Sequence, residues 1–173
     1  MIINNKIINK AEKIKLIITD IDGVWTDSRM YYTRDGSFMK SFSTYDGMGA
    51  HLLLKNQFIV AMITSEYENL DILRKRAKKL NIKEVYTNEK NKLDRVKYLM
   101  KKYELNKYNI AYIGDDINDL EAMRFSGLSV APSNTPILRH YKPDYVTNSN
   151  SGEGAFRDLA ELIMNAQNIS MKF

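Results

Sequence analysis

The sequence predicts an α/β fold in which a mostly parallel sheet has helices on both faces. Short apolar runs rich in β-branched residues alternate along the chain with longer segments of helical periodicity, which is the pattern of strand–helix units. Two of the runs, at residues 15–20 and 110–114, end at clustered carboxylates. The length of 173 residues favours one domain, so we expect residues 1–173 to form a single unit.

Composition narrows the functional class. Hydrophobic residues make up 44% and charged residues 27% of the chain, and cysteine is absent. No apolar run approaches the roughly 20 residues that cross a bilayer. We therefore expect a cytoplasmic protein with no membrane contact and no thiolate zinc site. The formal net charge is +5, but the basic cluster at residues 74–79 lies in a helix-like segment and lacks the aromatic companions of RNA-binding modules. We expect no nucleic-acid partner, and a small anionic substrate instead.

The first third of the chain is expected to hold two helices, one strand and a hairpin. Residues 4–13 place apolar side chains on one side of a short helix, and residues 15–20 form the continuous apolar run of a buried strand. Residues 29–43 hold two strand-like segments around the turn sequence Arg34-Asp35-Gly36, which predicts a small β-hairpin flap. Residues 46–49 are expected to open a helix that ends near Lys55.

The remaining segments alternate between strands and helices. Continuous apolar runs predict buried strands, and apolar side chains three to four residues apart predict helices. Gly127 is expected to end one of these helices in the C′ position. Strands are expected at residues 58–64, 84–86, 110–114, 128–131 and, at the sheet edge, 145–146. Helices are expected at residues 68–80, 91–103, 120–125 and 155–166.

Asp20 and Asp22 carry the first chemical signal. They are two residues apart at the end of an expected strand, so both carboxylates can point into one pocket. Gly23 lets the chain turn sharply after them. One carboxylate can attack phosphorus and form an aspartyl phosphate, while the other protonates the leaving oxygen and then accepts a proton from water. Two carboxylates repel a phosphate dianion, so a divalent cation, Mg²⁺, is expected.

Other strand ends add candidate groups at the same edge. Asp115 lies nearest the end of its strand and is the favoured metal ligand, whereas Asp116 and Asp119 can also be helix caps or supporting groups. Thr64 ends a strand, where its hydroxyl and the following backbone N–H groups can hold phosphate oxygens. Lys92 opens a helix and can offset the phosphoryl charge.

The order of these motifs resembles that of the haloacid dehalogenase-like phosphatase superfamily. The motifs are Asp20-Ile21-Asp22-Gly23-Val24, Thr64, Lys92 and Gly114-Asp115-Asp116-Ile117-Asn118-Asp119. The hairpin, Asp46-Gly47-Met48-Gly49 and Gly152-Glu153-Gly154 extend the resemblance to 3-deoxy-D-manno-octulosonate 8-phosphate phosphatases, over nearly the whole chain. This resemblance implies a Rossmann-like three-layer fold without a cap domain. It also implies a homotetramer in which the hairpin of one subunit and a C-terminal segment help to close a neighbour's site.

The resemblance further implies roles for the site residues. Asp20 would be the nucleophile and Asp22 the acid/base, with Mg²⁺ held by Asp20, the backbone carbonyl of Asp22 and Asp115. Thr64 and Lys92 would hold the phosphoryl group. The expected supporting residues are Asp116 and Asp119, and the expected substrate contacts are Ser65, Glu66, Asp46, Gly47 and Arg157.

Three positions depart from the octulosonate enzymes. Tyr45, Glu66 and Glu153 stand where those enzymes typically have arginine. At positions 66 and 153, a planar cation is replaced by an anion that can only accept hydrogen bonds. This exchange leaves hydrolysis possible but changes the groups that can contact the leaving group. The expected substrate is therefore a phosphorylated 2-keto-3-deoxy sugar acid of the eight-carbon type, or a nine-carbon 9-phosphate such as that of ketodeoxynononate or N-acylneuraminate. Arg139, Arg157 or a lysine of a neighbouring subunit can replace the lost charge.

Two other functions stay open from the sequence. A phosphomutase would share the aspartyl phosphate, but it normally needs a cap that excludes water. A non-catalytic oligomerising module of the same fold would not need the complete set of motif residues. Their joint retention favours the phosphatase.

Overall fold

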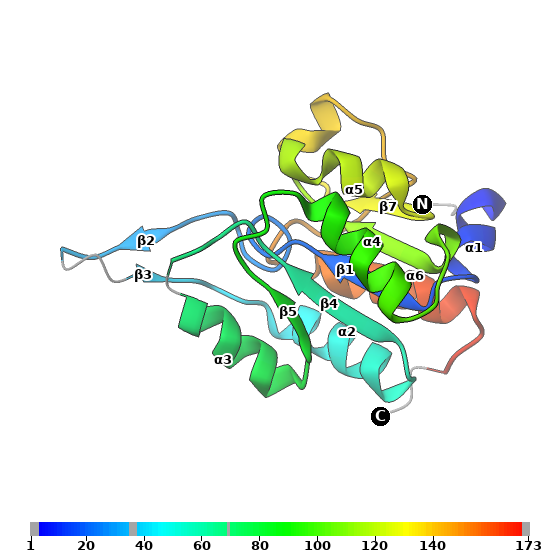
Figure 1. Cartoon of the computed structure of the whole chain (residues 1–173), viewed down its shortest axis with the longest axis horizontal. Coiled ribbons are helices and arrows are strands. Elements are labelled where there is room, and N and C mark those ends of the chain that lie inside the picture. Colours follow the sequence, from blue (N-terminus) through cyan, green and yellow to red (C-terminus); the bar gives the residue numbers. More distant parts are fainter. Residues whose placement is uncertain (1–3, 35–37, 69, 171–173) are drawn as a thin grey trace.

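The computed structural model describes residues 4–34, 38–68 and 70–170. It confirms the α/β fold: a six-stranded parallel sheet, in the order β5-β4-β1-β6-β7-β8, lies between two layers of helices (Figure 1). The strands of this sheet are β1 (Leu16–Thr19), β4 (Ile59–Ile63), β5 (Glu84–Tyr86), β6 (Ile110–Ile113), β7 (Leu128–Ala131) and β8 (Tyr145–Val146). The helices are α1 (Asn5–Ala11), α2 (Thr44–Lys55), α3 (Leu70–Leu80), α4 (Lys92–Lys102), α5 (Leu120–Phe125) and α6 (Ala155–Ala166). Within the described ranges, none of the helices is both long and apolar enough to span a bilayer.

The sheet separates two apolar cores. Ile17 of β1 belongs to the core that is covered by α1, α2, α3 and α6. Its neighbours Leu16 and Ile18 face the opposite core, which α4 and α5 cover. Every residue of β1 is buried, because helices lie on both sides of it. This explains why the strand is a continuous apolar run in the sequence rather than an alternating one.

The register of the sheet aligns the strand ends that matter. Thr19 at the end of β1 pairs with Met62 of β4 and with Ile113 of β6. The segments that follow these three positions leave the sheet at the same edge. Asp20 and Asp115, far apart in the sequence, are thereby brought together.

A hairpin extends from this edge of the sheet, as predicted (Figure 1). Its strands β2 (Tyr31–Tyr32) and β3 (Phe38–Met39) pair antiparallel. They are shorter than the sequence suggested, and both residues of β2 are exposed. Of the expected turn, Arg34 is described, whereas residues 35 and 36 lie outside the described residues.

Two helix ends differ from the expectation. Helix α2 begins at Thr44 rather than at residue 46, because Ser43 caps it: Ser43 Oγ accepts a hydrogen bond from the backbone N–H of Tyr45 at 3.1 Å. Gly127 does follow α5, but it does not adopt the left-handed conformation of a C′ glycine. A Cβ at this position would lie 2.5 Å from Tyr108 Cα. Close approach of two backbone segments therefore explains this glycine.

Candidate active site

An open cavity of about 530 Å³ lies at the carboxyl ends of β1, β4 and β6. This is the edge at which open α/β sheets bind their ligands. The loop after each of the three strands contributes to the wall, and the segment that leads into the hairpin closes one side. The lining residues are Asp20, Asp22, Ser28, Met30, Thr64, Ser65, Glu66, Asp115, Asp116, Ile117 and Asn118.

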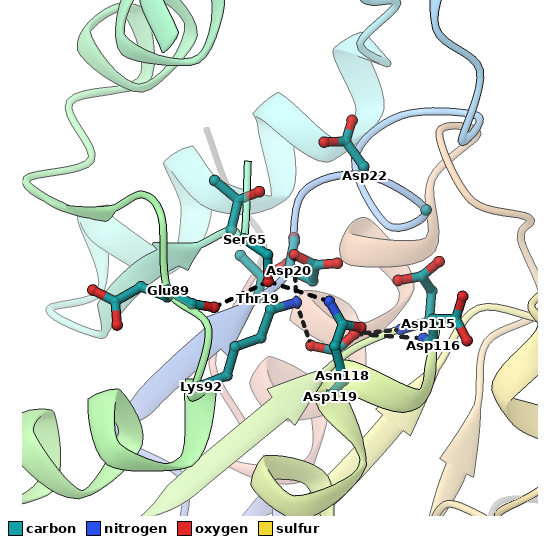
Figure 2. Close-up of polar contacts among 12 residues, drawn as sticks. Thr19, Asp20, Asp22, Ser65, Glu89, Lys92, Asp115, Asp116, Asn118 and Asp119 are labelled. Carbon is teal, nitrogen blue, oxygen red and sulfur yellow. Dashed lines mark hydrogen bonds and ion pairs between the residues drawn. The ribbon is translucent and has the colours of Figure 1, made fainter. Parts of the chain in front are cut away.

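Lys92 joins two buried carboxylates beside this cavity (Figure 2). Its Nζ lies 2.9 Å from Asp20 Oδ1 and 2.7 Å from Asp119 Oδ1, and all three side chains are at least nine-tenths buried. Asn91 caps α4 by accepting a hydrogen bond from the backbone N–H of Asp94, so Lys92 occupies the first turn and reaches the sheet edge. Burial opposes the charge of Lys92, but Asp20 and Asp119 outweigh it and raise the pKa of the ammonium. Lys92 is therefore a permanent cation of the site.

Asp119 connects Lys92 to the loop that follows β6. Its Oδ1 also accepts a hydrogen bond from the Tyr112 hydroxyl at 2.6 Å. Its Oδ2 accepts from the backbone N–H groups of Asp115 at 3.1 Å and Asp116 at 3.5 Å. Because both oxygens already have donors, Asp119 is better suited to position its neighbours than to bind a metal.

Asp20 and Asp115 are the carboxylates of this group that fit a divalent cation. Together with Asp119, which adds negative charge beside them, each places one oxygen within 4.8 Å of the others. Burial, and then repulsion from the neighbouring carboxylates, raises the pKa of Asp20 and of Asp115 in spite of Lys92. A single lysine thus leaves negative charge in the site uncompensated. Carboxylate oxygens with excess negative charge are the donor set that Mg²⁺ prefers.

Gly23 allows the first loop to approach this group. Its φ of +89° lies in the left-handed region. A Cβ at residue 23 would also lie 1.9 Å from Asp115 Oδ2, a distance no real contact allows. Both the conformation and the space therefore require glycine here.

Asp22 lines the cavity but turns away from Asp20 (Figure 2). Since β1 ends at Thr19, a turn rather than strand alternation sets the direction of Asp22. Lys40 holds it: Lys40 Nζ donates to Asp22 Oδ1 at 2.7 Å and to Oδ2 at 2.5 Å. The sequence interpretation did not single out Lys40. The chain has 26 lysines and arginines, and only its position in the hairpin segment distinguishes Lys40 from the others.

The loop after β4 forms the wall opposite Asp115. Thr64 is buried, and its Oγ1 accepts a hydrogen bond from the backbone N–H of Glu66 at 3.0 Å. Ser65 Oγ donates to the backbone carbonyl of Glu89 at 3.0 Å and accepts from Asn118 Nδ2 at 3.3 Å. Ser65 thereby ties this loop to the one that follows β6. The sequence interpretation had given Asn118 no role.

Three residues expected to contact the substrate lie outside this cavity. Asp46 is buried in α2, and its Oδ1 accepts the backbone N–H of Arg157 at 3.0 Å. Gly47 packs against the guanidinium of Arg76. Arg157 Nε donates to Glu161 at 2.6 Å on α6. Within this chain these contacts join α2, α3 and α6, and a substrate-binding role for the three residues stays a prediction.

Comparison with known proteins identifies the family to which this chain is similar. The sequence profile of haloacid dehalogenase-like hydrolases matches residues 3–159. The chain is 37% identical over 164 residues to the 3-deoxy-D-manno-octulosonate 8-phosphate phosphatase of Haemophilus influenzae, which covers 95% of this chain and 90% of that protein. The Escherichia coli enzyme of the same name is 37% identical over 161 residues, or 93% of this chain and 85% of the relative.

Solved structures agree with the sequence comparison. The Moraxella catarrhalis 3-deoxy-D-manno-octulosonate 8-phosphate phosphatase, in complex with a magnesium ion, a phosphate ion and a KDO molecule, matches with a TM-score of 0.90 and 35% identity, over 95% of this chain and 93% of that one. The Yersinia pestis enzyme matches with a TM-score of 0.90 and 35% identity, over 95% and 88%. The chain therefore belongs to the haloacid dehalogenase-like hydrolases and is a phosphatase of the 3-deoxy-D-manno-octulosonate 8-phosphate phosphatase family.

Proposed function

We propose that this protein is a magnesium-dependent phosphomonoesterase that hydrolyses a phosphorylated 2-keto-3-deoxy sugar acid, of the 3-deoxy-D-manno-octulosonate 8-phosphate type. One observation carries the proposal: the buried Asp20 carboxylate stands at the end of the central strand, 2.9 Å from Lys92 and beside Asp115. The residues that we propose as nucleophile, as metal ligand and as cation for the phosphoryl group thus lie in or beside the cavity. The Moraxella catarrhalis relative, whose structure holds magnesium, phosphate and KDO, supports it.

In the proposed reaction, an oxygen of Asp20 attacks phosphorus and the bond to the sugar oxygen breaks. Asp22 gives its proton to that oxygen, and the sugar acid leaves. Asp22 then takes a proton from water, which attacks the aspartyl phosphate and restores Asp20 as phosphate departs. Lys92 and Thr64 hold the phosphoryl oxygens. Mg²⁺, held by Asp20, Asp115 and the backbone carbonyl of Asp22, would compensate the negative charge of carboxylates and phosphate.

The nucleophile assignment is tested by Asp20→Asn. This variant should lose phosphate release from para-nitrophenyl phosphate and from sugar acid phosphates, because an amide cannot form the aspartyl phosphate. Chelation of Mg²⁺ should stop the unmodified enzyme. Asp94→Asn, an exposed aspartate in the first turn of α4, is the matched control and should keep full activity. Persistent hydrolysis by Asp20→Asn in a folded protein would show that another residue is the nucleophile.

A nine-carbon 9-phosphate is the second candidate substrate, and Glu66 is the observation that favours it. Glu66 lines the cavity, where the octulosonate enzymes typically have arginine. Its Oε1 accepts the backbone N–H groups of Tyr67 and Glu68 at 2.9 and 3.0 Å, which fixes the carboxylate in place. Among the described residues, the cavity lining contains no arginine that replaces the missing cation. An acceptor at this position suits hydroxyl or N-acyl donors of a longer sugar acid.

A panel of eight- and nine-carbon 2-keto-3-deoxy acid phosphates separates the two candidates. We expect kcat/KM to differ clearly between the two chain lengths, and Glu66→Arg to shift the preference toward the eight-carbon acid. Glu68→Arg, the neighbouring carboxylate, is the control. A preference for simple hexose phosphates would reject both sugar acids while leaving the phosphatase chemistry intact.

The same proposal includes a homotetramer in which the hairpin of one subunit covers a neighbour's cavity. Two observations support it. The cavity is open on this chain, and the hairpin exposes large apolar side chains, among them Tyr32 at 68% and Met39 at 66%. Exposed apolar clusters of this kind are typical of surfaces that bind another protein.

A further inference from the structure

Lys40 is almost fully withdrawn from solvent although it carries a charge. Its side chain is 5% exposed, and it bonds both oxygens of Asp22, whose side chain is 25% exposed. The Thr26 hydroxyl donates to Asp22 Oδ1 as well, at 3.2 Å. The carboxylate is therefore held from two sides, by the hairpin through Lys40 and by its own turn through Thr26.

The position of Lys40 links two separate parts of the fold. Lys40 directly follows β3 at the base of the hairpin, whereas Asp22 lies on the turn after β1. Lys40 also lines a small cavity together with Asp22, Thr64 and Glu66, so its side chain faces the catalytic edge of the sheet. A movement of the hairpin base would consequently move the carboxyl group of Asp22.

We propose that Lys40 is a positioning residue that aims Asp22 at the leaving-group oxygen. This inference rests on the proposed role of Asp22 as the acid/base. A carboxyl group has two oxygens, so Lys40 can keep one of them while the other carries the proton that passes to the sugar oxygen. Without Lys40, only the Thr26 hydroxyl would hold the carboxyl group, at Oδ1, and the proton would less often be in line with the breaking bond.

The leaving group itself supplies a selective readout. A para-nitrophenolate leaves without a proton, whereas a sugar alkoxide is a poor leaving group that needs one from the general acid. Because kcat/KM covers the reaction only up to the first irreversible step, it reports phosphoryl transfer to Asp20 and not the later hydrolysis. Loss of a purely structural contact would lower kcat/KM for both substrates alike.

The experiment measures kcat/KM of Lys40→Met for para-nitrophenyl phosphate and for the preferred sugar acid phosphate. We expect a loss of at least about ten-fold for the sugar acid phosphate and of less than about two-fold for the aryl ester. The upper limit is the contribution of a general acid itself, about 10²- to 10⁴-fold. Lys40→Arg, which also binds both carboxylate oxygens, should recover most of the loss. Should Lys40→Met fail to melt cooperatively, Lys40→Gln takes its place in the same comparison.

Two further variants show whether the loss in Lys40→Met comes from the acid role of Asp22. Lys10→Met removes another lysine–aspartate pair, with Asp144 at 2.5 Å, which is not part of the cavity lining, and should leave the ratio of the two kcat/KM values unchanged. Asp22→Asn should show the same selective loss as Lys40→Met, or a larger one. If Asp22→Asn is selective and Lys40→Met is not, the inference about Lys40 is wrong and the proposed function stands. If neither is selective, the acid role of Asp22 fails, and this inference fails with it.

Discussion

Asp20 and Asp115 illustrate how single residues make the site dependent on a cation. Both are buried beside other carboxylates, and Lys92 is the ammonium group that contacts Asp20 and Asp119. Burial and mutual repulsion raise the pKa of Asp20 and of Asp115. Without metal, protons relieve part of the repulsion. With metal, the cation takes over that role, so protons and Mg²⁺ compete for the same oxygens.

The first prediction follows from this competition. A carboxyl whose pKa is raised by folding stabilises the fold most at low pH, and this contribution is lost as the pH rises through its folded pKa. The metal-free protein should therefore lose thermal stability from mildly acidic to mildly alkaline pH. Mg²⁺ should raise Tm most at alkaline pH, by an amount equivalent to about 2.7 kcal/mol at one hundred times its Kd. Thermal melts with EDTA or MgCl₂ at both pH values test this.

Asp115→Asn is the control for that prediction. It should flatten the dependence of Tm on pH in EDTA and remove most of the stabilisation by Mg²⁺, because one ligand and one raised carboxyl are gone. An equal effect of Mg²⁺ on Tm at both pH values would contradict the competition between protons and metal.

At the scale of elements, α6 depends on a cap supplied by another helix. Its own N-cap residue, Gly154, has no side chain to offer. Asp46 of α2 takes this role, accepting the backbone N–H of Arg157 at 3.0 Å, and it is completely buried. One of its oxygens has no hydrogen-bond partner, and the facing Arg76 likewise has a buried Nε without one. The α2–α6 contact is thus tight but electrostatically costly.

The second prediction concerns this buried cap. Burial, with a small contribution from repulsion by Asp158, raises the pKa of Asp46 from 3.8 to about 6. The backbone hydrogen bonds at the start of α6 lower the pKa but do not cancel this effect. Stability should therefore fall as the pH rises from about 4 to about 6, by about 3 kcal/mol in total. Asp46→Asn should lose this dependence, while Asp46→Ala should also lose about 1 kcal/mol of capping at every pH. Urea unfolding at several pH values measures both effects, with Asp94→Asn as the exposed control.

The elements also differ in how well the sequence alone predicts their ends and their contacts. Strand ends at Asp20, Thr64 and Asp115 were predictable, because a buried parallel strand is a continuous apolar run that stops where the polar residues begin. The contacts of Lys40 with Asp22 and of Asp46 with α6 were not. Both join segments that are distant along the chain, and their partners are set by packing in three dimensions rather than by any local spacing.

At the scale of the whole molecule, the hairpin is held at its base by the contact of Lys40 with Asp22, but its two strands leave large apolar side chains exposed. It extends beyond the helical layers (Figure 1). Met30, Tyr31, Tyr32 and Met39 on it are between 38% and 68% exposed. Large apolar side chains gain free energy when they leave water, at about 25 cal/mol per Å² buried. Packing onto a second copy of the chain would bury them and, in the proposed assembly, cover an open cavity.

The third prediction tests that assembly with the double substitution of Tyr32→Ser and Met39→Ser. The molar mass in sedimentation or light scattering should fall from that of a tetramer, because the apolar contact area is lost. The kcat/KM for the sugar acid phosphate should fall by at least about ten-fold, whereas that for para-nitrophenyl phosphate should change little, since the neighbour's hairpin would contact the sugar rather than the phosphoryl group. Tyr108→Ser removes a tyrosine side chain that is 60% exposed and lies outside the hairpin. It should change neither the molar mass nor the kcat/KM for the sugar acid phosphate. A monomeric unmodified protein, or a variant that stays tetrameric with intact selectivity, would show that the hairpin serves only its own chain, where Lys40 already ties it to Asp22.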